Sequence, residues 1–136
     1  MGEKSKTILL VEDNPDVGFL IQSLFHSANL PVSFQVIKNG QEAVDYLSGK
    51  KPYANRENYP LPVIILTNIN MPYMSGFELL AWVKQHPQLK NLPVVLMSTY
   101  DDPKHLIQAA SLGAYSYFIQ TSSFDHLVDI VAKFVS

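Results

Sequence analysis

Apolar residues along the chain gather in short runs that alternate with longer segments in which apolar positions recur at helical spacing. Two of the short runs, ILLV and VIIL, are continuously apolar and do not alternate with polar residues. Such runs are typical of strands in a parallel sheet that is covered on both faces. The pattern predicts strands at Thr7–Glu12, Val32–Ile37, Pro62–Asn68, Pro93–Ser98 and Tyr115–Gln120.

Capping residues between these runs mark where helices begin. A cap residue before proline indicates a helix start, because proline at the first helical position lacks only an N–H that would stay unpaired. A cap residue with glutamate three positions later predicts a capping box, here at Asn39 and at Ser75. The expected N-caps are Asn14, Asn39, Ser75, Asp102 and either Ser122 or Ser123, and Gly113 is expected to close the fourth helix.

Five strands and five helices in strict alternation predict a single α/β domain over residues 1–136. The expected architecture is a doubly wound parallel sheet, for which 2-1-3-4-5 is a frequent strand order, and ligands bind beyond the carboxyl ends of its strands. The one long connection, Ser48–Pro62, is polar and rich in turn residues. We expect it to be a surface loop, with partner binding as the alternative.

Composition excludes several classes of function. Of the 136 residues, 47% are hydrophobic and 16% charged, and the net charge is −2, which argues against a broad nucleic-acid-binding or membrane-binding surface. The absence of cysteine removes disulfides, thiolate metal sites and thiol catalysis. The four histidines are widely spaced and show no zinc-binding pattern. The N-terminus has neither a signal peptide nor a membrane span, so a cytoplasmic location is expected.

Polar side chains stand at the ends of the predicted strands. The first strand ends in Glu12 and is followed by Asp13, and adjacent carboxylates at this edge are a plausible site for Mg²⁺, which prefers oxygen ligands. The alternative is that Asp13 serves only the start of the following helix. The other strand ends carry Asn68, Ser98 and Gln120.

Four segments of the sequence resemble the response-regulator receiver (CheY-like) family of two-component phosphorelay signalling. These are ILLVEDNPD, INMPYMSGFELL, PVVLMSTYDDP and LGAYSYFIQ. The resemblance extends from Lys6 to about Val135 and is specific because the four segments occur together. The long loop and the FDHLVDIV segment resemble a subgroup of small stand-alone receivers, including those that work beside bacterial phytochromes.

The resemblance assigns roles to residues that match the family pattern. The acidic pair that holds Mg²⁺ falls on Glu12 and Asp13, and the hydroxyl residue that contacts phosphate falls on Ser98. The aromatic switch position falls on Tyr117, for which the alternative is an ordinary strand aromatic packed against a helix. Tyr100 and Tyr115 lie near it in the same expected surface.

Two central positions depart from the family pattern. The phosphoacceptor aspartate falls on Asn68, and the phosphate-contacting lysine falls on Gln120, with Thr121 in place of the proline that usually follows. A neutral amide cannot act as the anionic nucleophile of phosphoryl transfer. Mg²⁺ binding is expected to be weak or absent, because one anionic oxygen ligand has become a neutral amide oxygen.

These departures predict a non-enzymatic pseudo-receiver that acts by protein–protein binding, independently of phosphorylation. The resemblance implies a sensor histidine kinase or another signalling protein as partner, or a homodimer through the face formed by helix 4, strand 5 and helix 5. One alternative is an ordinary phosphoacceptor with an engineered Asp-to-Asn change. Another is a flavodoxin-like cofactor binder, although the acidic EDNPD loop after the first strand would repel a phosphate.

Overall fold

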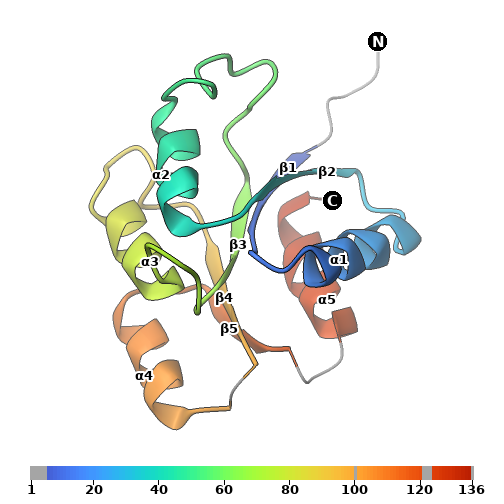
Figure 1. The fold of residues 1–136 in the computed structure, drawn as a ribbon. Helices are drawn as coiled ribbons and strands as arrows, with labels where there is room; N and C mark the ends of the chain where they lie inside the picture. Colours follow the sequence, from blue (N-terminus) through green and yellow to red (C-terminus); the bar gives the residue numbers. More distant parts are fainter. Residues whose placement is uncertain (1–5, 100, 121–123, 136) are drawn as a thin grey trace.

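The computed structural model describes residues 6–99, 101–120 and 124–135. Strands and helices alternate along the chain as the sequence predicts (Figure 1). The strands are β1 (Lys6–Val11), β2 (Val32–Ile37), β3 (Ile64–Asn68), β4 (Val94–Ser98) and β5 (Ser116–Ile119). The helices are α1 (Pro15–Ser27), α2 (Gly40–Ser48), α3 (Gly76–Lys84), α4 (Pro103–Ser111) and α5 (Phe124–Val135).

The five strands form one parallel sheet in the order β2-β1-β3-β4-β5, which confirms the predicted topology. Helices α1 and α5 cover one face of the sheet, and α2, α3 and α4 cover the other (Figure 1). Some predicted strand ends are wrong by one or two residues. Glu12 and Gln120 follow β1 and β5 and are not part of them, although the N–H group of each still bonds to a carbonyl of the neighbouring strand.

Alternate residues of each strand supply two separate hydrophobic clusters. In β1, Leu9 and Val11 pack under α2 and α3, whereas Ile8 and Leu10 pack under α1 and α5. All four side chains are fully buried. This two-sided burial is why the strand reads as a continuous apolar run.

The predicted N-caps of the first four helices are confirmed, and one of the two predicted capping boxes is wrong. Asn14 and Asp102 accept hydrogen bonds from backbone N–H groups in the first turns of α1 and α4. Ser75 and Glu78 form a complete capping box on α3. At α2, only half of the predicted box forms within the described chain: Asn39 accepts from the Glu42 N–H, but the Glu42 carboxylate accepts the Tyr53 hydroxyl at 2.6 Å. The predicted cap at Ser122 or Ser123 lies outside the described residues.

The long loop after α2 lies on the surface but is anchored by specific contacts. The Arg56 guanidinium donates to the carbonyls of Tyr46 and Leu47 at 2.9 and 3.0 Å, and so caps the C-terminus of α2. Tyr53 and Tyr59 pack edge to face, with ring centroids 5.1 Å apart, and both contact the Tyr46 ring. Burial raises the pKa of Tyr46 to about 12. These contacts give the loop a structural role that its polar sequence did not reveal.

No helix within the described ranges is long and apolar enough to cross a membrane.

Candidate functional site

Three side chains from distant parts of the chain meet at the carboxyl edge of the sheet. The Asn68 Nδ2 donates to Glu12 Oε2 at 3.1 Å and lies 3.4 Å from Oε1. The Gln120 Nε2 donates to Glu12 Oε1 at 3.5 Å. The backbone N–H of Asn14 donates to Glu12 Oε2 at 3.1 Å. Asn68 and Gln120, the two residues predicted to stand in place of the phosphoacceptor and the lysine, thus both donate hydrogen bonds to the same carboxylate.

Glu12 and Asp13 have different environments although they are adjacent. Glu12 is only 3% exposed because it follows the central strand β1, between the ends of β2 and β3. Asp13 is exposed. Burial raises the pKa of Glu12 from its ordinary value of 4.5, and the hydrogen bonds from Asn14 and Asn68 partly oppose this rise. The acidic pair therefore consists of one buried carboxylate held by amides and one carboxylate in solvent.

The raised pKa of Glu12 predicts a pH dependence of stability. A raised pKa means that the folded state binds the Glu12 proton more tightly than the unfolded state does. Protonation of Glu12 therefore contributes stability that is complete below pH 4.5 and is lost as the pH rises through the higher folded-state pKa. The Glu12→Gln variant lacks this pH-dependent contribution to stability, because glutamine cannot ionise. We expect wild type to gain stability relative to Glu12→Gln on acidification from pH 7 to about 4.5, measured by urea unfolding across that range. A constant difference between the two proteins would contradict the prediction.

Ser98 and Tyr117 occupy β4 and β5 beside this cluster. Ser98 is fully buried at the end of β4, and its carbonyl accepts a 2.7 Å hydrogen bond from the Gln120 backbone N–H. Tyr117 is half-buried and packs against the core cluster under α2 and α3. Tyr100, part of the predicted aromatic cluster, lies outside the described residues.

The side chains at the acidic edge do not fit a divalent cation as they are arranged. Both Glu12 oxygens accept N–H groups, and the Asn68 Oδ1 accepts the Asn70 N–H at 3.4 Å. A cation at the carboxylate would have to displace the two amide donors and bind fewer anionic oxygens than Mg²⁺ prefers. Among the residues described, no group of three or more His, Cys, Asp or Glu side chains could hold a metal ion.

Tyr73 is a feature of this edge that the sequence analysis missed. It lies in the loop between β3 and α3, is 88% exposed, and has a left-handed backbone conformation with φ of 71°. Tyrosine rarely adopts this conformation, because its Cβ crowds the following carbonyl oxygen. The sequence holds no signal for it, since glycine or asparagine is the usual residue at such a position.

Replacing Tyr73 with asparagine is expected to stabilise the protein by about 1 kcal/mol, because asparagine tolerates the left-handed conformation. The exposed ring makes few contacts that the change would remove. Urea unfolding of Tyr73→Asn checks the prediction. Tyr73→Val is the control and should destabilise, because a β-branched residue is strained at positive φ.

Comparison with known proteins gives the family. A model described as the response regulator receiver domain matches residues 8–132. The chain belongs to this family. Response regulator Rcp1 of Synechocystis is 31% identical over 126 residues, which cover 93% of this chain and 84% of Rcp1.

Two solved receiver structures show the same fold. The Mn²⁺-bound form of response regulator Rcp1 has a TM-score of 0.80 at 30% identity, covering 94% of this chain and 90% of that chain. The phosphorylated cyanobacterial phytochrome response regulator RcpA has a TM-score of 0.81 at 32% identity, covering 95% and 90%. The resemblance to phytochrome-associated receivers is confirmed, and receiver membership decides against the flavodoxin-like alternative.

Family membership establishes a signalling role. Receiver domains are signalling modules that interact with sensor kinases or other signalling proteins, and they bind Mg²⁺ or Mn²⁺ at their acidic site. This chain is therefore a receiver-domain module of two-component signalling. Its acidic site, however, has Asn68 and Gln120 bonded to the buried carboxylate.

Proposed function

We propose that this chain is a pseudo-receiver that binds other proteins without being phosphorylated. One observation carries the proposal: the side chain at the phosphoacceptor position is an amide that donates a hydrogen bond to Glu12. A phosphoacceptor must instead present an anionic oxygen toward an incoming phosphoryl group. Asn68 has no anionic oxygen, because its amide group is neutral, and the N–H group of this amide is directed at the Glu12 carboxylate.

Gln120 supports the same conclusion at a second position. The family lysine contributes a point positive charge to the phosphoryl oxygens, and a glutamine supplies no charge. Loss of one preorganised donor commonly lowers a rate by about 10²–10³. Gln120 instead donates to Glu12, so both substituted residues stabilise the unphosphorylated arrangement.

Weak Mg²⁺ binding follows from the same contacts. The site has carboxylates at Glu12 and Asp13 only, and the first is already hydrogen-bonded to neutral donors. A cation must compete with these donors without the additional carboxylate of an ordinary receiver. We expect binding too weak to measure by calorimetry at millimolar Mg²⁺.

The face formed by α4, β5 and α5 is the proposed site for a signalling partner. Leu106 and Ile107 on α4 are 55% and 70% exposed, and Tyr115, just before β5, is 47% exposed. Tyr115 packs edge to face on Phe134 of α5, with ring centroids 5.0 Å apart. Exposed apolar and aromatic side chains on one surface favour protein binding. The partner is a sensor histidine kinase, another signalling protein or a second copy of the chain.

The rival proposal is an ordinary phosphoacceptor with a single engineered Asp-to-Asn change. The glutamine at position 120 argues against this rival. A single Asp-to-Asn change at position 68 would already disable phosphorylation, so an engineered protein would not need a second change in place of the lysine. The natural gene sequence decides this alternative: an aspartate codon at position 68 would establish it.

The experiment that tests the proposal is a ¹H–¹⁵N NMR titration with Mg²⁺ and beryllofluoride, a phosphoryl mimic. We expect no saturable shifts in the amides of Asn68, Ser98, Tyr117 and Gln120. The matched control is the double variant Asn68→Asp/Gln120→Lys, which restores the family residues and is expected to respond. Saturable shifts in wild type that spread to Tyr117 would show a working switch and refute the proposal.

A further inference from the structure

A pocket around Arg56 lies between the end of α2, the long loop and the end of α3. Its volume is about 520 Å³, which falls within the range of small-molecule sites, roughly 300–1,000 Å³. Apolar atoms make up the larger part of its lining. Helices α2 and α3 begin at the carboxyl edge of the sheet and run back toward its opposite edge. The pocket is therefore separate from the acidic edge at Glu12.

Hydrogen bonds to backbone carbonyls hold the Arg56 guanidinium in place. Its Nη1 donates to the Tyr46 and Tyr59 carbonyls at 2.9 and 3.1 Å, and its Nη2 donates to the Leu47 carbonyl at 3.0 Å. A guanidinium has five N–H groups, so the Nε–H and one Nη2–H stay unpaired. Nε is not buried away from solvent. Because Nη1 and Nη2 donate to consecutive carbonyls, the free pair lies on the Nε side, where a guanidinium can bind a carboxylate through two hydrogen bonds.

The charge of Arg56 has no counter-ion in the part of the chain that the structure describes. Arg56 is partly buried there and makes no ion pair. The carbonyl end of a helix carries about half an elementary negative charge, so the C-terminus of α2 offsets the guanidinium only in part. None of the residues that line the pocket is acidic. The pocket thus offers a ligand a positive charge and two free hydrogen-bond donors.

Two stacked rings and three leucines form the apolar part of the lining. The ring centroids of Trp82 and His86 are 4.0 Å apart, and the His86 Nδ1 lies 2.6 Å from the Trp82 carbonyl oxygen. A carbonyl only accepts, so Nδ1 carries the proton and the imidazole is held against the indole. Leu47 and Leu89 are buried, whereas Leu61 is 48% exposed. An apolar group that lies against Leu61 would remove this surface from water.

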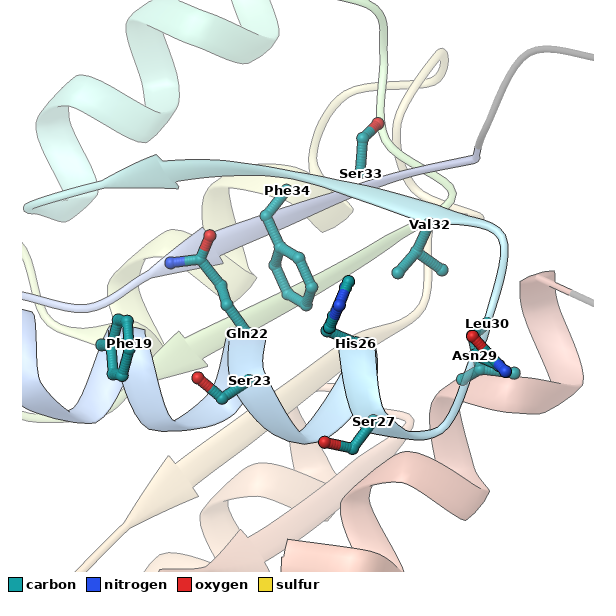
Figure 2. Close-up of a pocket in the computed structure, with 10 residues that line it drawn as sticks. All are labelled: Phe19, Gln22, Ser23, His26, Ser27, Asn29, Leu30, Val32, Ser33 and Phe34. Atoms are coloured by element: carbon teal, nitrogen blue, oxygen red, sulfur yellow. The ribbon is translucent and has the colours of Figure 1, made fainter.

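The hollow between α1 and β2 provides a comparison within the same molecule. It has a similar volume, about 540 Å³. Gln22 and His26 of α1 and Phe34 of β2 point into it (Figure 2). No lysine, arginine, aspartate or glutamate lines it. We expect no preference for an anion in this hollow, so it serves as an internal control.

We propose that the pocket around Arg56 binds a small organic carboxylate with an apolar ring. The carboxylate accepts hydrogen bonds from the Nε–H and Nη2–H of Arg56, and the ring packs against Leu61 and Trp82. An inorganic anion would leave the apolar lining in water, and a neutral ligand would leave the guanidinium charge without a partner. The inference goes beyond the proposed function and does not rest on it, because neither Asn68 nor Gln120 lines the pocket.

Phenylacetate, phenylacetamide and acetate separate the two contributions in a ¹H–¹⁵N NMR titration without Mg²⁺ or beryllofluoride. Phenylacetate has both the charge and the ring, phenylacetamide lacks the charge, and acetate lacks the ring. With phenylacetate we expect saturable shifts of the Arg56 Nε–H and Trp82 Nε1–H resonances and a dissociation constant of roughly 1 mM. Phenylacetamide and acetate should each bind at least about tenfold more weakly. The backbone amides of Gln22 and Phe34 should not respond.

Leu61→Glu and Leu61→Gln are matched variants for this pocket. Leu61→Glu adds a carboxylate to the lining and should weaken phenylacetate binding at least about tenfold relative to Leu61→Gln, which has the same size without the charge. The dispersion of the amide spectrum shows that each variant is folded. The proposal would be overturned if phenylacetate did not saturate at tens of millimolar, if phenylacetamide bound equally well, or if the two variants had equal affinities. Phenylacetate shifts confined to Gln22 and Phe34 would also overturn it.

Discussion

Replacing Asn68 with aspartate is expected to lower the free energy of unfolding by about 3 kcal/mol at pH 7 without divalent cations. The substitution converts a hydrogen-bond donor 3.1 Å from Glu12 Oε2 into a second carboxylate. Glu12 is 3% exposed, so solvent screens the repulsion poorly and both the lost hydrogen bond and the like charge count against folding. Millimolar Mg²⁺ should recover part of the loss, because the cation can bind between the two carboxylates.

Urea unfolding with and without Mg²⁺ measures this effect. Asn68→Ala is the control: it removes the same donor without adding charge, so it should destabilise less and show no Mg²⁺ dependence. If Asn68→Asp were as stable as wild type without a cation, the amide would not be holding Glu12 and the account of the site would be wrong.

Gly76→Ala is expected to destabilise the protein by about 3 kcal/mol and to shift the backbone that positions Asn68. A Cβ at Gly76, the first residue of α3, would lie 2.5 Å from the Asn68 carbonyl oxygen and 3.0 Å from the Ile69 Cα. Both contacts are with backbone atoms, so either the end of β3 or the start of α3 must shift. The Gly76 N–H bond to the Ile69 carbonyl, 2.9 Å long, would be strained by the same movement.

Gly18→Ala is the matched control for this prediction. Gly18 lies within α1, and the nearest atom to a new Cβ there is Val36 Cγ1 at 4.0 Å. Alanine is the better helix former, so this variant should gain about 0.5–1 kcal/mol. Thermal unfolding compares the two variants, and the Asn68 side-chain amide resonance should move in Gly76→Ala alone. Equal stabilities would show that the β3–α3 junction is more adaptable than its contacts indicate.

Much of the fold was predictable from the sequence because its signals are local. Continuous apolar runs marked the buried strands, and Asn14, Ser75 and Asp102 marked helix starts by bonding to N–H groups two or three residues away. Errors arose where a local signal had a distant competitor. The Glu42 carboxylate matched a capping box, but Tyr53, eleven residues away, takes its hydrogen bond. Arg56 lies in the long loop, and no local pattern in the sequence indicates that it caps α2 through the Tyr46 and Leu47 carbonyls.

In the candidate site too, some features were readable from the sequence and others were decided only by the tertiary structure. The sequence by itself determined which side chains stand at the strand ends, and its resemblance to receivers predicts that Asn68 and Gln120 stand in place of the groups that phosphoryl transfer needs. Only the tertiary structure decided that both amides donate to Glu12, from positions 56 and 108 residues away in the chain. The burial of Glu12, the left-handed Tyr73 and the pocket around Arg56 were likewise absent from the pattern. These features depend on which strands are neighbours in the sheet and how the connecting loops close over its edges, and no local run of residues encodes that arrangement.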